Sequence, residues 1–183
     1  YISPFFVTNK EAMTAELIDP FVLVTDKKIS VLKEFLPVLE AVTKTGKSLL
    51  IIADDVDGEA LATLVLNHMR QVIRAVAIKA PEFGERRKAC LADICVLTGA
   101  TLVSDDIGRK IETISLEDLG RVSKATITRE NTTFVGGKGD KFELENRIKQ
   151  LALEIQSCNS DYEKEKLQER LAKLAGGVAV IKV

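Results

Sequence analysis

Histidine, tryptophan and cysteine are scarce in this chain. It has no tryptophan and one histidine, His68, so a histidine-based metal site and a Ser/His/Asp or Cys/His catalytic arrangement are not expected. The three cysteines, Cys90, Cys95 and Cys158, are an odd number and lack CxxC spacing. This pattern argues against a disulfide scaffold and favours a reducing compartment.

Long apolar runs and a strong net charge are also missing. No stretch approaches the ~20 apolar residues that span a bilayer, and no signal peptide is recognisable, so we expect no membrane association. A net charge of −1 offers no basic field for nucleic acid. The chain does have 46% hydrophobic residues in 183 positions, enough for the core of one domain. Because it begins at Tyr1 and ends in a strand-like segment, residues 180–183, we interpret it as a piece of a longer protein.

Short apolar strands alternate with amphipathic helices, which predicts a mixed α/β (α+β) domain with a central sheet or sandwich. The expected strands lie within residues 16–25, 49–53, 71–80, 124–128 and 132–135, and the expected helices are 34–45, 59–70, 87–97, 143–156 and 160–175. Pro37 would cost a hydrogen bond inside a helix, so we place it in the first turn of the helix that starts near Glu34. The last two helices flank a tight link at Asn159 and should form an antiparallel hairpin.

The expected helix over residues 59–70 is apolar over about twice the ~100° arc that a surface helix needs. One apolar stripe contains Leu61, Val65 and Val72, with Ala60 and Leu64 beside it. A second stripe contains Ala62, Leu66, Met69 and Ile73, and the polar face contains Glu59, Thr63, Asn67 and Arg70. Either this helix is buried on both sides, or one side packs in the core and the other is available to a partner. Periodicity alone favours burial on both sides.

Two enzyme classes can be weighed against a binding module. Asp54 and Asp55 follow one apolar strand and Lys79 follows another, as in a response-regulator receiver, but no suitable third carboxylate is found to hold Mg²⁺. The glycine-rich loop at residues 136–140 is not followed by GK[ST], and the chain contains no GxGxxG. A receiver-like domain and a nucleotide-binding α/β domain therefore remain only as alternatives.

Several segments, in order along the whole chain, carry a family resemblance. The longest is LLIIADDVDGEALATLVLNHMR at 49–70, and the others are YISPFF at 1–6, DKKIS at 26–30, LPVLE at 36–40, KAPEFGERRK at 79–88 and the stretch from 160 to 183. Together they resemble the apical domain of the GroEL-type (group I, 60 kDa) chaperonins. In that family this domain binds non-native polypeptides and the mobile loop of a GroES-type co-chaperonin. Relatives usually have glycine where Glu82 stands and often where Ala100 stands.

The resemblance implies a chaperonin apical-domain fold, with a β-sandwich core flanked by helices, a C-terminal helical hairpin and a binding groove between two helices. The residues that it implies as ligand contacts are Tyr1, Ser3, Phe5, Phe6, Leu36, Leu39, Glu40, Glu59, Leu61, Val65, Leu66, Asn67 and Arg70. From the pattern alone, Leu36 and Leu39 would instead be core residues. The aromatic residues of segment 1–6 fit the core and the surface equally well.

The resemblance also divides the chain into an apical domain, residues 1–175, and a segment 176–183 that holds a hinge at Gly176 and Gly177 and a strand returning toward an intermediate domain. The equatorial domain that binds ATP and Mg²⁺ would lie outside the chain. So would the contacts that build heptameric rings, two of which would form a double-ring tetradecamer. We therefore expect a chaperone fragment without a cofactor, ATPase activity or a nucleic-acid partner. The expected compartment is the bacterial cytoplasm, with the mitochondrial matrix or plastid stroma as alternatives.

Overall fold

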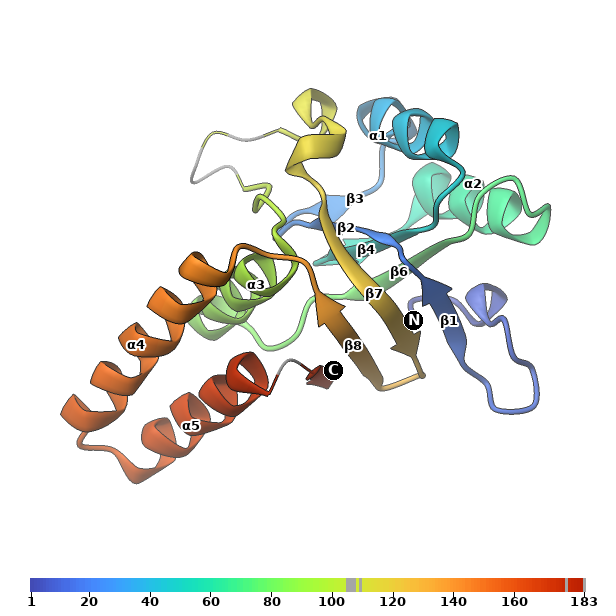
Figure 1. Cartoon of the computed structure of the whole chain (residues 1–183). Helices are drawn as coiled ribbons and strands as arrows, with labels where there is room; N and C mark the ends of the chain where they lie inside the picture. Colours follow the sequence, from blue (N-terminus) through green and yellow to red (C-terminus); the bar gives the residue numbers. More distant parts are fainter. Residues whose placement is uncertain (105–107, 109, 177, 183) are drawn as a thin grey trace.

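The chain folds as a mixed α/β structure in which helices flank a seven-stranded sheet (Figure 1). This computed structural model describes residues 1–104, 108, 110–176 and 178–182. The described strands are β1 Ala15–Ile18, β2 Phe21–Val24, β3 Lys28–Ile29, β4 Leu49–Ala53, β5 Asp55–Val56, β6 Ala75–Lys79, β7 Gly120–Ile127, β8 Asn131–Gly137 and β9 Val178–Lys182. The described helices are α1 Leu32–Thr45, α2 Gly58–Met69, α3 Gly84–Thr98, α4 Lys141–Ser157 and α5 Asp161–Ala175, with short 3₁₀ turns that include η1 Pro4–Phe6.

Strand β7 joins a parallel half of the sheet to an antiparallel half. Strands β2, β4 and β6 are parallel, in the order β6-β4-β2, and β2 pairs antiparallel with the first residues of β7. The far end of β7 pairs with β1, and its other edge pairs with β8, which in turn pairs with β9. The mixed α/β class of the fold was therefore predicted from the sequence. The sequence did not reveal that one strand, β7, pairs with both halves of the sheet.

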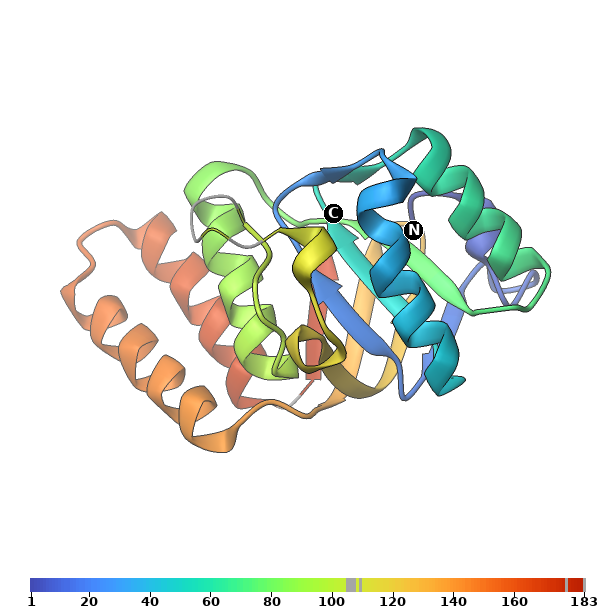
Figure 2. The same cartoon turned by 90° about the horizontal axis from the view of Figure 1, so that it is seen from above.

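The parallel half explains why two helices share one face of the molecule. Every residue of β4 is fully buried, as expected for a strand covered on both faces. The connections β2–α1–β4 and β4–α2–β6 step across the sheet in the same direction, and right-handed crossovers then place α1 and α2 on the same side. Helices α3, α4 and α5 lie together, away from α1 and α2 (Figures 1 and 2).

Pro37 lies in the second turn of α1, not in its first turn as predicted. The helix begins at Leu32, and its glycine C-cap, Gly46, has a left-handed φ of 73°. A proline at this position leaves the carbonyl of Lys33 without its helical donor. Both Lys33 and Pro37 are exposed, so water can reach this carbonyl and the helix tolerates the proline.

The predicted C-terminal hairpin is confirmed: α4 and α5 pack side by side (Figures 1 and 2). Asp140 and Ser160 cap the two helices by accepting hydrogen bonds from backbone N–H groups. A buried carboxylate docks the hairpin to α3, because Asp93 accepts from Arg147 Nε at 2.8 Å and from Arg170 Nε at 2.6 Å. Gly176 ends α5 with a φ of −77°, a conformation open to any residue, and Gly177 lies outside the described residues.

The turn before α3 contains a non-glycine residue in the left-handed region. Glu82 has a φ of 59°, and its carbonyl accepts a hydrogen bond from Arg87 Nε at 2.9 Å. A Cβ atom in this conformation costs ~1–2 kcal/mol. The backbone at this position is therefore better suited to glycine than to the glutamate that the sequence has.

Replacing Glu82 by glycine should stabilise the fold. Glycine removes the Cβ penalty but adds ~0.4–1 kcal/mol of conformational entropy to the unfolded chain, so Glu82→Gly should raise the free energy of unfolding by about 0.5–1 kcal/mol. Urea denaturation measures this change. The control is Glu82→Ala, which removes the charge and keeps Cβ. An equal gain in both variants would assign the effect to the charge and contradict the backbone argument.

Candidate functional site

Helix α2 presents apolar side chains to the solvent. Its buried stripe consists of Ala60, Leu64 and His68, while Leu66 and Met69 are 47% and 59% exposed. The helix is therefore not buried on both sides, as periodicity alone had favoured. This buried stripe lies next to the apolar stripe of Leu61 and Val65, both of which are half-buried against the core.

Helix α1 adds exposed side chains beside α2, with which it is in contact. Leu36 is 38% exposed and Glu40 is exposed, whereas Leu39 is buried among core side chains. Both views of the fold show α1 and α2 on the same side of the parallel strands (Figures 1 and 2). We call Leu36 and Glu40 of α1, with Leu61, Val65, Leu66 and Met69 of α2, the α1–α2 face.

Polar residues border this face along α2. Glu59 and Arg70 are exposed at the two ends of the helix. Asn67 is half-buried, and its Nδ2 donates to the Thr63 carbonyl one turn earlier at 2.8 Å. Glu59 and Arg70 can therefore contact a ligand directly, whereas the Asn67 amide already donates a hydrogen bond within its own helix.

The N-terminal segment divides its predicted contact residues between core and surface. Phe6 has 0% exposure and meets the His68 ring edge-on, with 5.6 Å between ring centroids. Ser3 is buried and caps η1 by accepting a hydrogen bond from the Phe5 backbone N–H at 3.3 Å. Phe5 points the other way and is 61% exposed, and Tyr1 is half-buried. Ser3, Phe6 and Leu39 thus support the surface from beneath and are not part of it.

An open pocket of about 720 Å³ lies where η1 meets the end of α2. Phe5 and Met69 line it together with Met13, Lys10 and Arg74. Only Phe5 among these five was predicted as a contact residue. Periodicity had shown Met69 as part of an apolar stripe, but no sequence signal connects residues 10–13 with residues 69–74.

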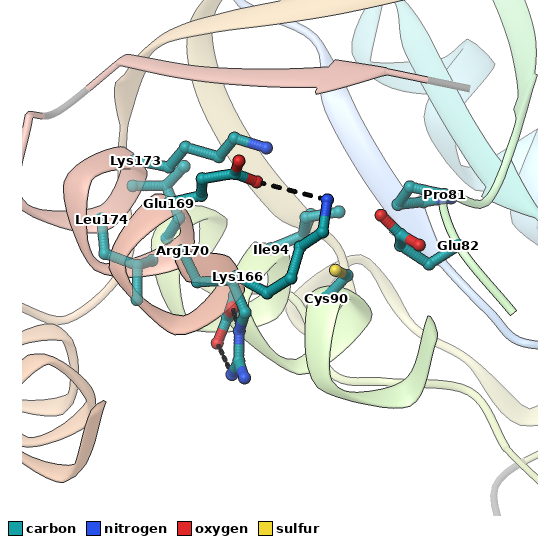
Figure 3. A pocket seen from close by; sticks show the side chains of 11 residues that line it. Pro81, Glu82, Cys90, Ile94, Lys166, Glu169, Arg170, Lys173 and Leu174 are labelled. Carbon is teal, nitrogen blue, oxygen red and sulfur yellow. Dashed lines mark hydrogen bonds and ion pairs between the residues drawn. The ribbon is translucent and has the colours of Figure 1, made fainter. Parts of the chain in front are cut away.

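A second pocket, of about 330 Å³, separates α3 from α5 (Figure 3). Its charges are balanced, since Arg170 pairs with Asp93 and Lys166 lies 3.8 Å from Glu169. Burial raises the pKa of the Cys90 thiol, and the nearby Asp93 adds to the effect. Because the thiolate is the nucleophilic form, this environment does not activate Cys90.

The acidic turn after β4 is engaged by cations. Asp54 pairs with Arg87, while Asp57 lies 2.6 Å from Lys28 Nζ and accepts from the Ser30 hydroxyl. The hydrogen bond from the Lys28 ammonium lowers the pKa of Asp57, and the hydrogen bond from the Ser30 hydroxyl adds a smaller effect in the same direction. Among the described residues, no group of three His, Cys, Asp or Glu side chains could hold a metal ion. No helix in that part of the chain is long and apolar enough to cross a membrane.

His68 should make the fold sensitive to pH. Burial, followed by the charge of Arg74, lowers its pKa below the ordinary 6.5, and its Nδ1 has no hydrogen-bond partner among the described residues. Just below pH 6.5 the unfolded chain thus binds more protons than the folded one. The contribution of neutral His68 to the free energy of unfolding is therefore fully present above this pH. It is lost as the pH falls toward the pKa of His68 in the folded chain.

We expect the free energy of unfolding to fall as the pH is lowered from about 7.5 toward the folded pKa, by up to ~1.4 kcal/mol for each pH unit between 6.5 and that pKa. Denaturation curves of the wild type and of His68→Leu, measured across this range, test the prediction. Leucine fills the site without titrating, so the variant should show a smaller pH dependence. Identical pH profiles for the two proteins would refute a role for His68.

The sequence was also compared with models of known protein families, and none of them matches the chain. The features of the chain that bear on its function are the family-like segments between residues 1 and 183 and the geometry of the α1–α2 face.

Proposed function

We propose that this chain is the polypeptide-binding apical domain of a GroEL-type chaperonin subunit. In this proposal the α1–α2 face binds apolar segments of non-native polypeptides, and it also binds the mobile loop of a GroES-type co-chaperonin. The observation that carries the proposal is the exposure of Leu66 and Met69 on a helix whose opposite stripe is locked into the core. The ordered resemblance along the chain supports it.

The chemistry of the face suits a ligand of low sequence specificity. Burying one apolar ligand side chain is worth ~1.5–3 kcal/mol, and this attraction requires no directional match. Exposed Glu40, Glu59 and Arg70 can hydrogen-bond an extended ligand backbone at the border of the face. One domain should bind weakly, and the proposed heptameric ring would raise the avidity by presenting seven such faces to one chain.

The finer features of the family belong to the same proposal. The division of the sheet at β7 is compatible with an apical-domain β-sandwich, and the docked α4–α5 hairpin suits the expected C-terminal pair. We propose that ATP and Mg²⁺ act in an equatorial domain outside this chain, and that the segment at Gly176 and Gly177 is a hinge. The proposed compartment is the bacterial cytoplasm, with the mitochondrial matrix or plastid stroma as alternatives.

The receiver-like alternative finds less support. Its candidate carboxylates form structural contacts: Asp54 pairs with Arg87, and Asp55 Oδ1 accepts from the Val56 backbone N–H at 2.9 Å. A phosphate-accepting aspartate would have to give up such contacts to bind Mg²⁺. The exposed apolar residues on α2 would also have no role in a receiver.

A charge placed on the α1–α2 face should weaken ligand binding. Leu66→Glu should raise the Kd of a labelled apolar peptide by at least about tenfold, because it removes one apolar contact and places a carboxylate in the interface. Fluorescence anisotropy measures the affinity, and circular dichroism verifies that the variant is folded.

The matched control is Leu153→Glu, since Leu153 is 66% exposed on α4, away from the α1–α2 face. This variant should bind the peptide like the wild type. Equal weakening by both substitutions would indicate a nonspecific charge effect, and unchanged binding by Leu66→Glu would place the ligand elsewhere. Either result would overturn the proposed site.

A further inference from the structure

The pocket between η1 and the end of α2 has a charge pattern that the α1–α2 face does not share. Both charged side chains that line it, Lys10 and Arg74, are cationic. Both are exposed, and neither forms an ion pair with a carboxylate among the described residues. Glu11 is the acidic residue of the turn before β1, and it does not line the pocket. The positive charge of this pocket is therefore not neutralised by its own walls.

The rest of the lining is apolar enough to hold a side chain. Phe5, Met13 and Met69 line the pocket from three different segments and are all at least 48% exposed. Methionine side chains adapt to ligands of different shape. The volume of about 720 Å³ falls within the range typical of ligand sites.

Backbone hydrogen bonds hold the walls of the pocket in place. The turn before β1 is closed by Thr8 N–H donating to the Thr14 carbonyl at 3.0 Å and Thr14 N–H donating to the Asn9 carbonyl at 3.2 Å. Asn9 Oδ1 accepts from two further N–H groups within this turn, each at 3.1 Å. At the opposite wall, Gln71 N–H donates to the His68 carbonyl at 3.1 Å. A preorganised pocket loses little entropy when a ligand enters.

We propose that this pocket selects, among apolar polypeptide segments, those in which a carboxylate lies next to a bulky apolar side chain. The apolar side chain would pack between Phe5, Met13 and Met69, and the neighbouring aspartate or glutamate would pair with Lys10 and Arg74. This inference rests on the proposed function and adds a chemical preference to it. Exposed ion pairs of this kind support a preference of about three- to tenfold.

Two labelled peptides test the preference. They share one apolar sequence, and two glutamates next to its aromatic residues in one peptide are replaced by glutamines in the other. The readout is the Kd of the glutamine peptide divided by the Kd of the glutamate peptide, so a general change in affinity divides out. The wild-type ratio should be about three to ten at low salt and should fall toward one as salt screens the charges.

Charge variants then assign the preference to the pocket. The double variant Lys10→Gln, Arg74→Gln should bring the ratio to about one, and Lys10→Glu, Arg74→Glu should invert it. The matched control, Lys149→Gln, Lys164→Gln, makes the same change in net charge on exposed residues of the hairpin and should keep the wild-type ratio.

The outcomes separate this inference from the proposed function. If both peptides bind the wild type equally, the acidic preference is wrong and the chaperone proposal stands. If the ratio survives in Lys10→Gln, Arg74→Gln, or disappears in the hairpin control, the pocket does not produce it. If neither peptide binds the wild type at all, the proposed function fails and the preference fails with it.

Discussion

Strand β4 is the constraint on which the proposed binding surface depends. It is buried on both faces and is hydrogen-bonded along both edges, to β2 and to β6. A strand in this position can neither shift its register nor tilt without breaking two ladders and exposing core side chains. Helices α1 and α2 are the connections into and out of this strand, so their positions are fixed from beneath. The exposed Leu36, Leu66 and Met69 are consequently held on a rigid support.

Exposing these residues brings no benefit to the folded domain alone. Ala60, Leu64 and His68, together with the half-buried Leu61 and Val65, already supply the core contacts of α2, so Leu66 and Met69 remain in water without adding to the core. Exposed apolar patches of this kind mark interaction surfaces or aggregation hazards. The turn η1 likewise has one residue in the core and one at the surface: Phe6 packs against His68, and its neighbour Phe5 is exposed. Each exposed group thus stands next to a buried one that fixes its direction.

Periodicity predicted most of the architecture and failed where a pattern was nearly uniform. The α4–α5 hairpin has clear apolar stripes and was predicted correctly, and the short apolar strands indicated the α/β class. Helix α2 is apolar over most of its circumference, so its sequence could not specify which stripe faces the core, and the structure buries Ala60, Leu64 and His68. Leu36 and Leu39 show the same ambiguity in α1, where only the first is substantially exposed. The pocket at Met13 and Arg74 joins distant segments, which no local pattern reveals.

The two parts of the surface would contribute differently to selection. Burial of apolar side chains on the α1–α2 face favours every unfolded chain to a similar degree, because the hydrophobic effect is non-directional. The cations at the neighbouring pocket add a smaller term that depends on the ligand's charge and decreases with ionic strength. A ring of such domains would multiply both terms, since each engaged domain raises the effective concentration at the next. A modest charge preference in one domain can therefore become an appreciable one when a single polypeptide contacts several domains at once.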